Sequence, residues 1–381
     1  MGAWPVSSTP RRLRIAMMLA SDGPGGAEMM TFRLSEELRE RGHTVVYVGP
    51  QRGRRWLGDL FRGAGFTDEL VPIGRRWVDL PFARAITTVI RKHSIDVVHG
   101  HEFDMAVYGA ACARWVGVPN IVTMHGGLTV TRGWHRKIAL RWAYRRSAAT
   151  VVVSAATRAQ FASDLSLPES MFTVIPNGVP TKAGNAGAVR TEFGCTRDDL
   201  VLLAVGTLET NKGHRVLLDA LALLHRNGLR LPWKLIIAGG RGGDQHEPLL
   251  DFVRTSGLDE HVHIVTGRND IADLQALADI FVMPSYREGM PMALLEAMVA
   301  GKAIIASRTG GIPETVADGT EALLVPAGDV PALSIALHTL LTDAARRSAL
   351  GDAARRRGHQ QFSVTVMADR YSELYARALQ R

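Results

Sequence analysis

Apolar runs of strand length alternate with helical repeats along the whole chain. After a first apolar run, Met30, Leu34 and Leu38 recur every four residues, which predicts a helix that stops at Gly42. Strands separated by helices are typical of a parallel α/β sheet. The predicted strands cover residues 12–20, 45–48, 95–99, 120–124, 150–153, 172–175, 200–205 and 280–283.

The strand–loop–helix pattern begins a second time near the middle of the chain. Residues 200–205 repeat the first strand, and the helix that follows ends near Gly228. The small, Gly-rich stretch 181–188 lacks an apolar pattern and is interpreted as a linker. The sequence therefore predicts two Rossmann-like domains, residues 1–180 and 181–363.

The C-terminal segment, residues 364–381, is predicted to be a helix with one apolar stripe. Met367, Tyr371, Leu374, Tyr375 and Ala378 recur at helical spacing. Because such a stripe needs a covering surface, we expect this helix to pack back on the first domain.

Composition sets the broad class of the protein. With 381 residues, 46% hydrophobic and 22% charged, the chain is an ordinary globular sequence of two-domain size. Cys112 and Cys195 lie far apart and suggest no disulfide framework. The early apolar run, residues 15–20, is too short for a membrane span or a secretory signal. A cytoplasmic protein is expected.

The positive charge is concentrated in the first half. Residues 1–180 hold 23 Lys and Arg against 14 Asp and Glu, whereas the remainder holds 22 against 23. This asymmetry suggests an anionic partner for the first half, such as anionic lipid or a phosphorylated substrate; simple compositional bias is the alternative. No alternating basic and aromatic pattern indicates nucleic acid, which is not expected as a partner.

Several motifs are absent. Glu28 stands where a dinucleotide fingerprint needs its third Gly, no loop ends in Gly-Lys-Ser or Gly-Lys-Thr, and Asp-x-Asp does not occur. His99 and His101, like His261 and His263, alternate along predicted strands, but a metal site there is not favoured. We expect no metal and no resident cofactor.

The most informative segment is residues 279–329. Glu288 comes directly before a predicted helix, and Glu296 lies within that helix, about 12 Å away at 1.5 Å per residue. Two carboxylates at this spacing suit the two ends of one elongated ligand. The backbone of Gly289, Met290, Pro291 and Met292 between them could hold an anion. The alternative is a chance pair on a solvated helix.

The run PSYREGMPMALLEAMVAGK, followed by TGGIPE, resembles the Glu, seven residues, Glu signature of retaining glycosyltransferases in family four. That large group has the GT-B fold. The resemblance implies two Rossmann-like domains that face one another across a cleft, with the terminal helix crossing back to the first. It also implies that Glu288 holds hydroxyls of the donor sugar and that Glu296 holds the ribose of the nucleotide.

Other segments extend the resemblance over nearly the whole chain. GGAE (Gly25, Gly26) is similar to the glycine loop that approaches the donor phosphates, and IPNGV is similar to a structural hinge. TMHGG places His125 directly after a strand, which implies an active-site residue near donor and acceptor; a structural loop histidine is the alternative. VGTLETNKG matches the diphosphate loop, with Lys212 as its phosphate-binding residue.

One position departs from the family pattern. Thr207 stands where the family usually has Arg, and a neutral hydroxyl cannot replace bidentate phosphate recognition. Arg241 or Arg268 could compensate. Without compensation, a non-catalytic sugar-nucleotide-binding module is one alternative, and a sugar-nucleotide epimerase of the same fold is another.

The implied activity is retaining transfer of a hexosyl or N-acetylhexosaminyl group from a nucleotide-sugar, with a UDP-sugar favoured over a GDP-sugar. The implied acceptor is a saccharide or a polyprenyl-diphosphate-linked saccharide in polysaccharide or glycoconjugate assembly. Both follow from the resemblance.

The predicted helix within residues 132–146 has two interpretations. Trp134, Ile138 and Trp142 form one stripe with basic residues around it. The favoured interpretation packs this stripe on the domain's own sheet, because the doubly wound order needs a helix there. In the other, the helix lies peripherally on the inner face of an anionic membrane.

Overall fold

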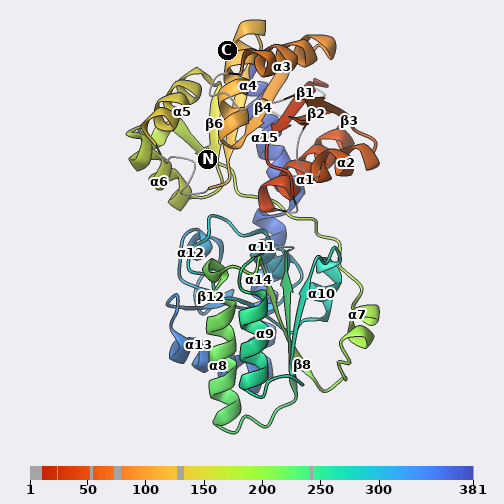
Figure 1. Ribbon diagram of the computed structural model, residues 1–381, viewed down its shortest axis with the longest axis vertical. Helices are drawn as coiled ribbons and strands as arrows, with labels where there is room; N and C mark the ends of the chain where they lie inside the picture. The colour runs from red at the N-terminus through yellow and green to blue at the C-terminus, as the bar shows by residue number, and fades with distance from the viewer. Residues whose placement is uncertain are drawn as a thin grey trace. The chain divides into compact units, whose positions relative to one another are not determined.

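The computed structural model describes residues 11–23, 25–51, 55–72, 79–126, 133–240 and 243–380. The chain divides into two compact units (Figure 1). The first consists of Met1–Val151, Phe161–Thr173 and Ala368–Arg381, and the second of Val152–Gln160 and Val174–Met367. The chain thus enters the second unit at Val152, returns at Phe161 and enters it again at Val174, whereas one boundary at residue 180 was predicted.

The first unit is a seven-stranded sheet in the order β3-β2-β1-β4-β5-β6-β7. The pairs β1–β2, β1–β4, β2–β3 and β4–β5 are parallel. The elements up to residue 174 are β1 Arg14–Leu19, α1 Gly26–Glu40, β2 Thr44–Pro50, α2 Trp56–Gly63, β3 Thr67–Val71, α3 Leu80–Lys92, β4 Val97–His101, α4 Glu102–Val116, β5 Asn120–Met124, α5 Trp134–Arg146, β6 Ala149–Val152, α6 Ala155–Leu165, the 3-10 helix η1 Glu169–Met171 and β7 Phe172–Val174.

The second unit is a six-stranded parallel sheet in the order β10-β9-β8-β11-β12-β13. Its elements are α7 Ala186–Glu192, β8 Leu200–Val205, the 3-10 helix η2 Thr210–Lys212, α8 His214–Arg226, β9 Trp233–Gly239, α9 His246–Thr255, β10 Val262–Thr266, α10 Ile271–Leu277, β11 Ile280–Met283, α11 Met292–Val299, β12 Ala303–Ser307, α12 Ile312–Thr315, β13 Ala322–Val325, α13 Val330–Thr342 and α14 Ala344–Gln361. Buried Val, Ile and Leu side chains on both faces make the central strands β8 and β11 apolar throughout, whereas the edge strand β10 is only partly buried.

Both sheets reverse their strand order once, between β1 and β4 in the first unit and between β8 and β11 in the second. Open α/β sheets bind ligands at this reversal, beyond the carboxyl ends of the strands. The predicted site residues Lys212, Glu288 and His125 follow strands at these ends.

Several elements differ from the sequence prediction, which did not include β3, β9, β12 or β13 among the strands. The strand β3 carries Asp68 and Glu69 and is only partly buried at the sheet edge, so it lacks the apolar run that marks the other strands. The predicted linker is shorter than expected, because α7 begins at Ala186, where the Asn185 side chain accepts a hydrogen bond from the Gly187 N–H group.

The face of α5 that packs on the sheet is not the predicted one. Leu140, Ala143 and Tyr144 are buried, whereas Trp134 and Ile138 are 74% and 58% exposed. A helix buries one stripe about 100° wide, and here Tyr144, edge-on to Phe172, belongs to the stripe that packs. The interpretation that placed the tryptophan stripe inside was wrong.

The C-terminal helix α15, Val364–Ala378, has its last turns in the first unit. Tyr371 and Tyr375 are fully buried there. The Tyr375 hydroxyl is hydrogen-bonded to His99 Nδ1 at 2.7 Å, and the Tyr371 hydroxyl to Thr123 Oγ1 at 3.0 Å. Because His99 Nε2 also meets Thr123 Oγ1 at 2.8 Å, the buried polar atoms form one satisfied network.

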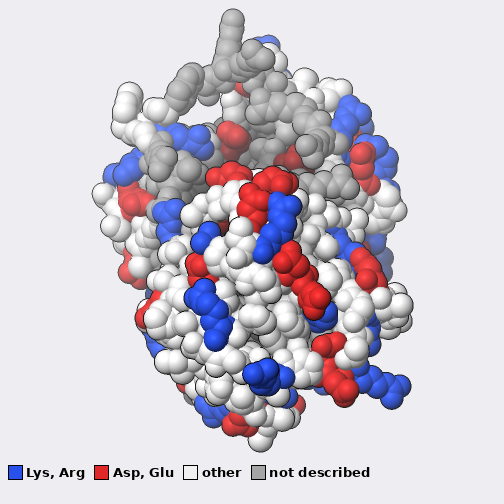
Figure 2. Space-filling model, turned by 60° about the horizontal axis from the view of Figure 1, so that its bottom comes forward, with Lys and Arg blue, Asp and Glu red and all other residues white. Residues whose placement is uncertain are grey.

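No helix of the described residues is long and apolar enough to cross a membrane. On the face drawn in Figure 2, basic and acidic side chains lie interspersed among uncharged ones. That mixture agrees with the nearly balanced charge of residues 181–381.

Replacing Tyr375 by Phe should lower the free energy of unfolding of the first unit by about 1–3 kcal/mol, because His99 Nδ1 would lose its buried partner. Chemical denaturation measures the change. Tyr286→Phe is the control, since this tyrosine is 41% exposed, and should stay within about 0.5 kcal/mol. Equal losses in the two variants would contradict the role given to the buried network.

Candidate functional site

In the second unit, the loops that follow β8 and β11 lie together. Gly213 has a φ of +67°, and a Cβ atom there would collide with the carbonyl oxygen of Pro284. Only glycine permits both this conformation and this approach. The Tyr286 N–H group donates to the Asn211 carbonyl at 2.8 Å, and the Asn211 amide donates to the Arg287 carbonyl at 3.1 Å. The two loops therefore form one surface.

This contact brings two predicted site residues into an ion pair. Lys212 Nζ donates to Glu288 Oε1 at 2.8 Å, and the two side chains are 24% and 9% exposed. The sequence placed both residues at the site but not in contact. In a partly buried pair of this kind, each charge compensates the other.

The loop from Glu288 leads through Gly289 and Met290 into α11. Pro291 is the N-cap, and no side chain caps the first turn. The start of α11 therefore keeps N–H groups that suit an anion. Glu296 lies on this helix and is partly buried.

Asn177 fixes the same loop. Its amide donates to the Met290 carbonyl at 3.2 Å, and its backbone N–H group approaches Met290 Sδ at 3.2 Å. The hinge-like segment around Asn177 thus supports the site loop directly, which its sequence did not reveal.

The TGGIPE segment supports the opposite side. The Gly311 N–H group donates to the Glu288 carbonyl at 3.2 Å, and a Cβ on Gly310 or Gly311 would collide with the backbone of Glu288 or Gly289. Glu314 accepts hydrogen bonds from the N–H groups of Ala155 and Ala156 at the start of α6, at 2.7 and 2.5 Å. A carboxylate is favourable at a helix N-terminus, so this glutamate is structural.

Of the two arginines expected to compensate for Thr207, the structure describes Arg268. Arg268 is held by Glu192 at 2.5 and 2.9 Å and by Asp270 at 2.8 and 2.5 Å, and these bonds raise its pKa. Its guanidinium is engaged by carboxylates, not by the diphosphate loop. Arg241 lies outside the described residues.

A buried histidine follows the Lys212 loop. His214 is the first residue of α8 and is 3% exposed. Burial lowers its pKa to about 4, so it is neutral at pH 7. No sequence pattern indicated this residue, since a histidine at a helix start is ordinarily solvated.

In the first unit, the glycine loop follows β1. Gly25 is the N-cap of α1 and Gly26 its first residue, and no side chain caps the helix. Glu28 is buried and its carboxylate turns back toward Gly25. The carboxylate therefore occupies the space that a Cβ atom on Gly25 would need.

His125 follows β5, as predicted, and meets a second histidine. Its Nε2 atom lies 3.0 Å from His101 Nδ1, and the rings stack at an interplanar angle of 12°. His101 is fully buried, with its other nitrogen 3.1 Å from Met17 Sδ. Burial lowers the pKa of His101 well below its ordinary value, which keeps it neutral.

Glu102 was missed by the sequence interpretation. Its carboxylate accepts a hydrogen bond from the His125 backbone N–H group at 3.0 Å, and its φ of +59° is unusual for a residue with a side chain. Burial, with a contribution from Glu28, raises the pKa of Glu102 to about 7. A glutamate directly after a strand, in the run HGHE, was the available signal.

The described residues contain no group of three or more His, Cys, Asp or Glu side chains arranged to hold a metal ion. His99 and His101 do share a face, with ring centroids 4.2 Å apart, but each bonds to neighbours inside the protein. His261 Nδ1 is hydrogen-bonded to the Trp233 carbonyl, and His263 lies against Phe193.

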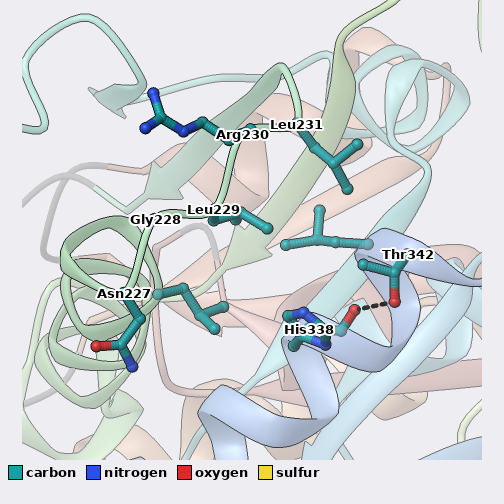
Figure 3. Close-up of a pocket in the computed structure, with 9 residues that line it drawn as sticks. Asn227, Gly228, Leu229, Arg230, Leu231, His338 and Thr342 are labelled. Carbon is teal, nitrogen blue, oxygen red and sulfur yellow. Dashed lines mark hydrogen bonds between the residues drawn. The ribbon is translucent and has the colours of Figure 1, made fainter.

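A surface pocket elsewhere in the second unit has no part in this site. Leucines and the end of α8 line it, with His338 and Thr342 of α13 opposite (Figure 3). The Thr342 hydroxyl donates to the His338 carbonyl at 2.8 Å. None of the predicted site residues lines this pocket.

Comparisons with known proteins agree on one family. Residues 189–357 match the model for glycosyl transferases group 1, and residues 24–183 match that for glycosyltransferase family 4. A GDP-mannose-dependent alpha-(1-6)-phosphatidylinositol monomannoside mannosyltransferase of Mycolicibacterium smegmatis is 30% identical over 94% of this chain and 97% of its own length. The chain is a family four glycosyltransferase. The resemblance found in its sequence motifs is confirmed.

Other relatives differ in what their names describe. A UDP-Gal:alpha-D-GlcNAc-diphosphoundecaprenol alpha-1,3-galactosyltransferase of Escherichia coli is 25% identical to this glycosyltransferase over 78% of the chain and 79% of its own length. The structure of Anabaena HepE in complex with UDP has a TM-score of 0.81 at 21% identity, covering 95% of this chain and 99% of its own. This likeness supports the GT-B fold.

The stability of this glycosyltransferase should fall as the pH is lowered below about 6.5. The pKa of His99 is lowered to about 3 and that of His101 well below 6.5, so the unfolded chain binds protons there that the folded chain excludes. In His101→Gln, the slope of unfolding free energy against pH should decrease by up to about 1.4 kcal/mol per pH unit. Urea unfolding between pH 5 and 8 measures both slopes; an unchanged slope in the variant would refute the assignment.

Proposed function

We propose that this glycosyltransferase moves a sugar from a nucleoside diphosphate donor to a saccharide or lipid-linked saccharide acceptor, with retention of configuration. The observation that carries the proposal is the Lys212–Glu288 pair at the strand-order reversal, beside the uncapped start of α11. A site that binds a sugar diphosphate needs a cation and free N–H groups for the phosphates and a carboxylate for the sugar hydroxyls.

The Lys212–Glu288 ion pair suggests an order of events when the donor binds. The donor diphosphate takes Lys212 as its partner, and Glu288 is released to accept hydrogen bonds from sugar hydroxyls. As the glycosidic bond breaks, negative charge grows on the diphosphate while the sugar gains oxocarbenium character. Lys212 and the start of α11 stabilise that charge. No divalent metal is required in this proposal.

Glu296 would hold the ribose, and His125 would lie beside the donor sugar and the acceptor. Retention follows if the acceptor enters on the face from which the diphosphate leaves. The His101 contact and the Glu102 hydrogen bond fix the ring and the backbone of His125, respectively. This support gives the loop histidine a defined orientation.

The relatives differ in the nucleotide of the sugar donor that their names give. The M. smegmatis relative is named for GDP-mannose and the E. coli relative for UDP-Gal. We propose a UDP-sugar, as the polysaccharide-assembly character of EGMPMALLEA suggests. Polysaccharide or glycoconjugate assembly in the cytoplasm is the proposed setting.

Calorimetric titration with UDP, GDP, ADP and CDP, first without metal and then with magnesium, tests the donor site. One diphosphate should bind selectively without metal. Lys212→Ala should weaken it by about 10- to 100-fold, since a charge-assisted bond to phosphate contributes about 1.5–3 kcal/mol. Glu296→Ala should also weaken it. Lys182→Ala and Glu247→Ala, both at exposed positions, are the matched controls and should bind as the unaltered protein does.

If none of the four nucleotides bound, the assignment of the donor site would be wrong. Binding with neither transfer nor hydrolysis across a broad acceptor panel would favour a non-catalytic module. Release of an altered free sugar without an acceptor would favour an epimerase.

Glu288→Gln separates binding from turnover. Glu288 pairs with Lys212 and so competes with the diphosphate for this lysine. The variant should therefore bind the nucleoside diphosphate at least as tightly as the unaltered protein. Its kcat should fall by at least about tenfold, as a sugar contact is lost in the transition state. Weaker diphosphate binding, equal to that of Lys212→Ala, would contradict the exchange of partners.

A further inference from the structure

The helix α5 presents an apolar stripe to solvent. Trp134, Ile138 and Trp142 are 74%, 58% and 39% exposed. They recur every four residues, on the side of the helix opposite the buried Leu140 and Ala143. Two of the molecule's seven tryptophans thus lie on one exposed helix face, which is unusual for side chains of this size.

Basic side chains surround this stripe. The helix contains Arg136, Lys137, Arg141, Arg145 and Arg146 and no acidic residue. Among the described residues, no acidic side chain pairs with Lys137, Arg141, Arg145 or Arg146. At 3.6 residues per turn, Arg141 and Arg145 fall on the exposed face, alongside Ile138. Arg136 instead stacks over Phe103 at 3.8 Å.

An anionic bilayer surface matches this combination. Indole rings favour the boundary between headgroups and acyl chains, and each basic residue near a negatively charged surface adds attraction. The stripe from Trp134 to Trp142 is about 12 Å long at 1.5 Å per residue, which suits a helix lying flat in that boundary. A helix of 13 residues is too short to span the membrane.

Other partners fit less well. A second copy of the chain would bring its own five basic residues against these five, and like charges across a symmetric interface repel. Single-stranded nucleic acid would find two rings for stacking, but Ile138 stands between them and offers no π-face.

We propose that α5 docks this protein on anionic lipid surfaces, with Trp134, Ile138 and Trp142 in the headgroup boundary and Arg141 and Arg145 against lipid phosphates. The inference rests on the exposed helix and not on the proposed sugar transfer. An acceptor carried on lipid would be met at such a surface, but docking does not require that acceptor.

Vesicle sedimentation tests the proposal with the full chain. The protein should bind vesicles of equimolar phosphatidylglycerol and phosphatidylcholine, bind vesicles of phosphatidylcholine alone far more weakly, and be released by added salt. Arg141→Gln with Arg145→Gln should lower the partition coefficient by roughly 10- to 30-fold, as two surface charges are removed. Trp134→Ser with Trp142→Ser should lower it by at least about tenfold.

Matched controls lie elsewhere on the surface. Trp115→Ser replaces a tryptophan that is 64% exposed on α4, and Arg355→Gln with Arg356→Gln replaces two exposed arginines on α14. Both should bind as the unaltered protein does. All substitutions are at solvent-facing or partly exposed positions, and an unchanged thermal midpoint confirms that each variant is folded.

Three outcomes would overturn the proposal. The first is no binding of the unaltered protein to anionic vesicles. The second is equal binding by the α5 variants and the controls. In the third, the α5 variants bind vesicles as the unaltered protein does but lose self-association or oligonucleotide binding. Quenching of tryptophan fluorescence by brominated lipid gives a second readout, which should decrease in Trp134→Ser with Trp142→Ser and persist in Trp115→Ser.

Discussion

Close backbone approach around the loop from Pro284 to Pro291 is the constraint on which the second unit's site depends. Gly213 meets this loop from one side, and Gly310 and Gly311 meet it from the other, each at a place where a Cβ atom would collide. The glycines bring three strand-end loops within hydrogen-bonding distance. As a result, the Lys212–Glu288 pair forms between loops far apart in sequence. A larger residue at any of these glycines would displace the Glu288 carboxylate or the Lys212 ammonium group more than it would disturb the sheet.

The first unit positions its residues by a different device, a buried polar network. His99 and His101 lie fully inside the sheet layer and remain neutral because burial disfavours their charged forms. The hydroxyls of Tyr371 and Tyr375 complete the network from the C-terminal helix. This arrangement couples the last helix to the strands that carry the loop histidine. It also makes the unit sensitive to acid, since below the ordinary pKa of histidine the unfolded chain binds protons that the buried imidazoles exclude.

Most of the fold could be predicted because a parallel strand that is buried on both faces has a continuous run of apolar residues in the sequence. Residues 120–124, 200–205 and 280–283 are strands with the predicted limits. The strand β3 has no such run, since an edge strand with one partner tolerates Asp68 and Glu69. The face on which α5 packs could not be predicted either. Its sequence holds two apolar stripes, and the contact with Phe172 that favours Tyr144 is made in three dimensions.

The site shows the same division between local pattern and long-range contact. Glu288, Lys212 and His125 were predicted because each lies near the end of a strand or the start of a helix within a dense motif, and Glu296 because it lies eight residues after Glu288 in the same motif. The partners of these residues were not found: Asn177 lies 113 positions from Met290, and Glu102 lies 23 from His125. Glu314 was in view within TGGIPE, yet its bonds to α6 span about 160 positions.

Thr207 shows how the site manages with fewer positive charges than the family pattern supplies. Arg268 is bound by two carboxylates, so moving it to a phosphate would break several charge-assisted bonds. Lys212 and Arg287 are the basic side chains of the two described loops, and Arg287 points into solvent. Glu288 holds Lys212 at 2.8 Å. In the proposed donor site, binding therefore depends on one exchange of partners, in which the diphosphate takes the place of a carboxylate that already holds Lys212.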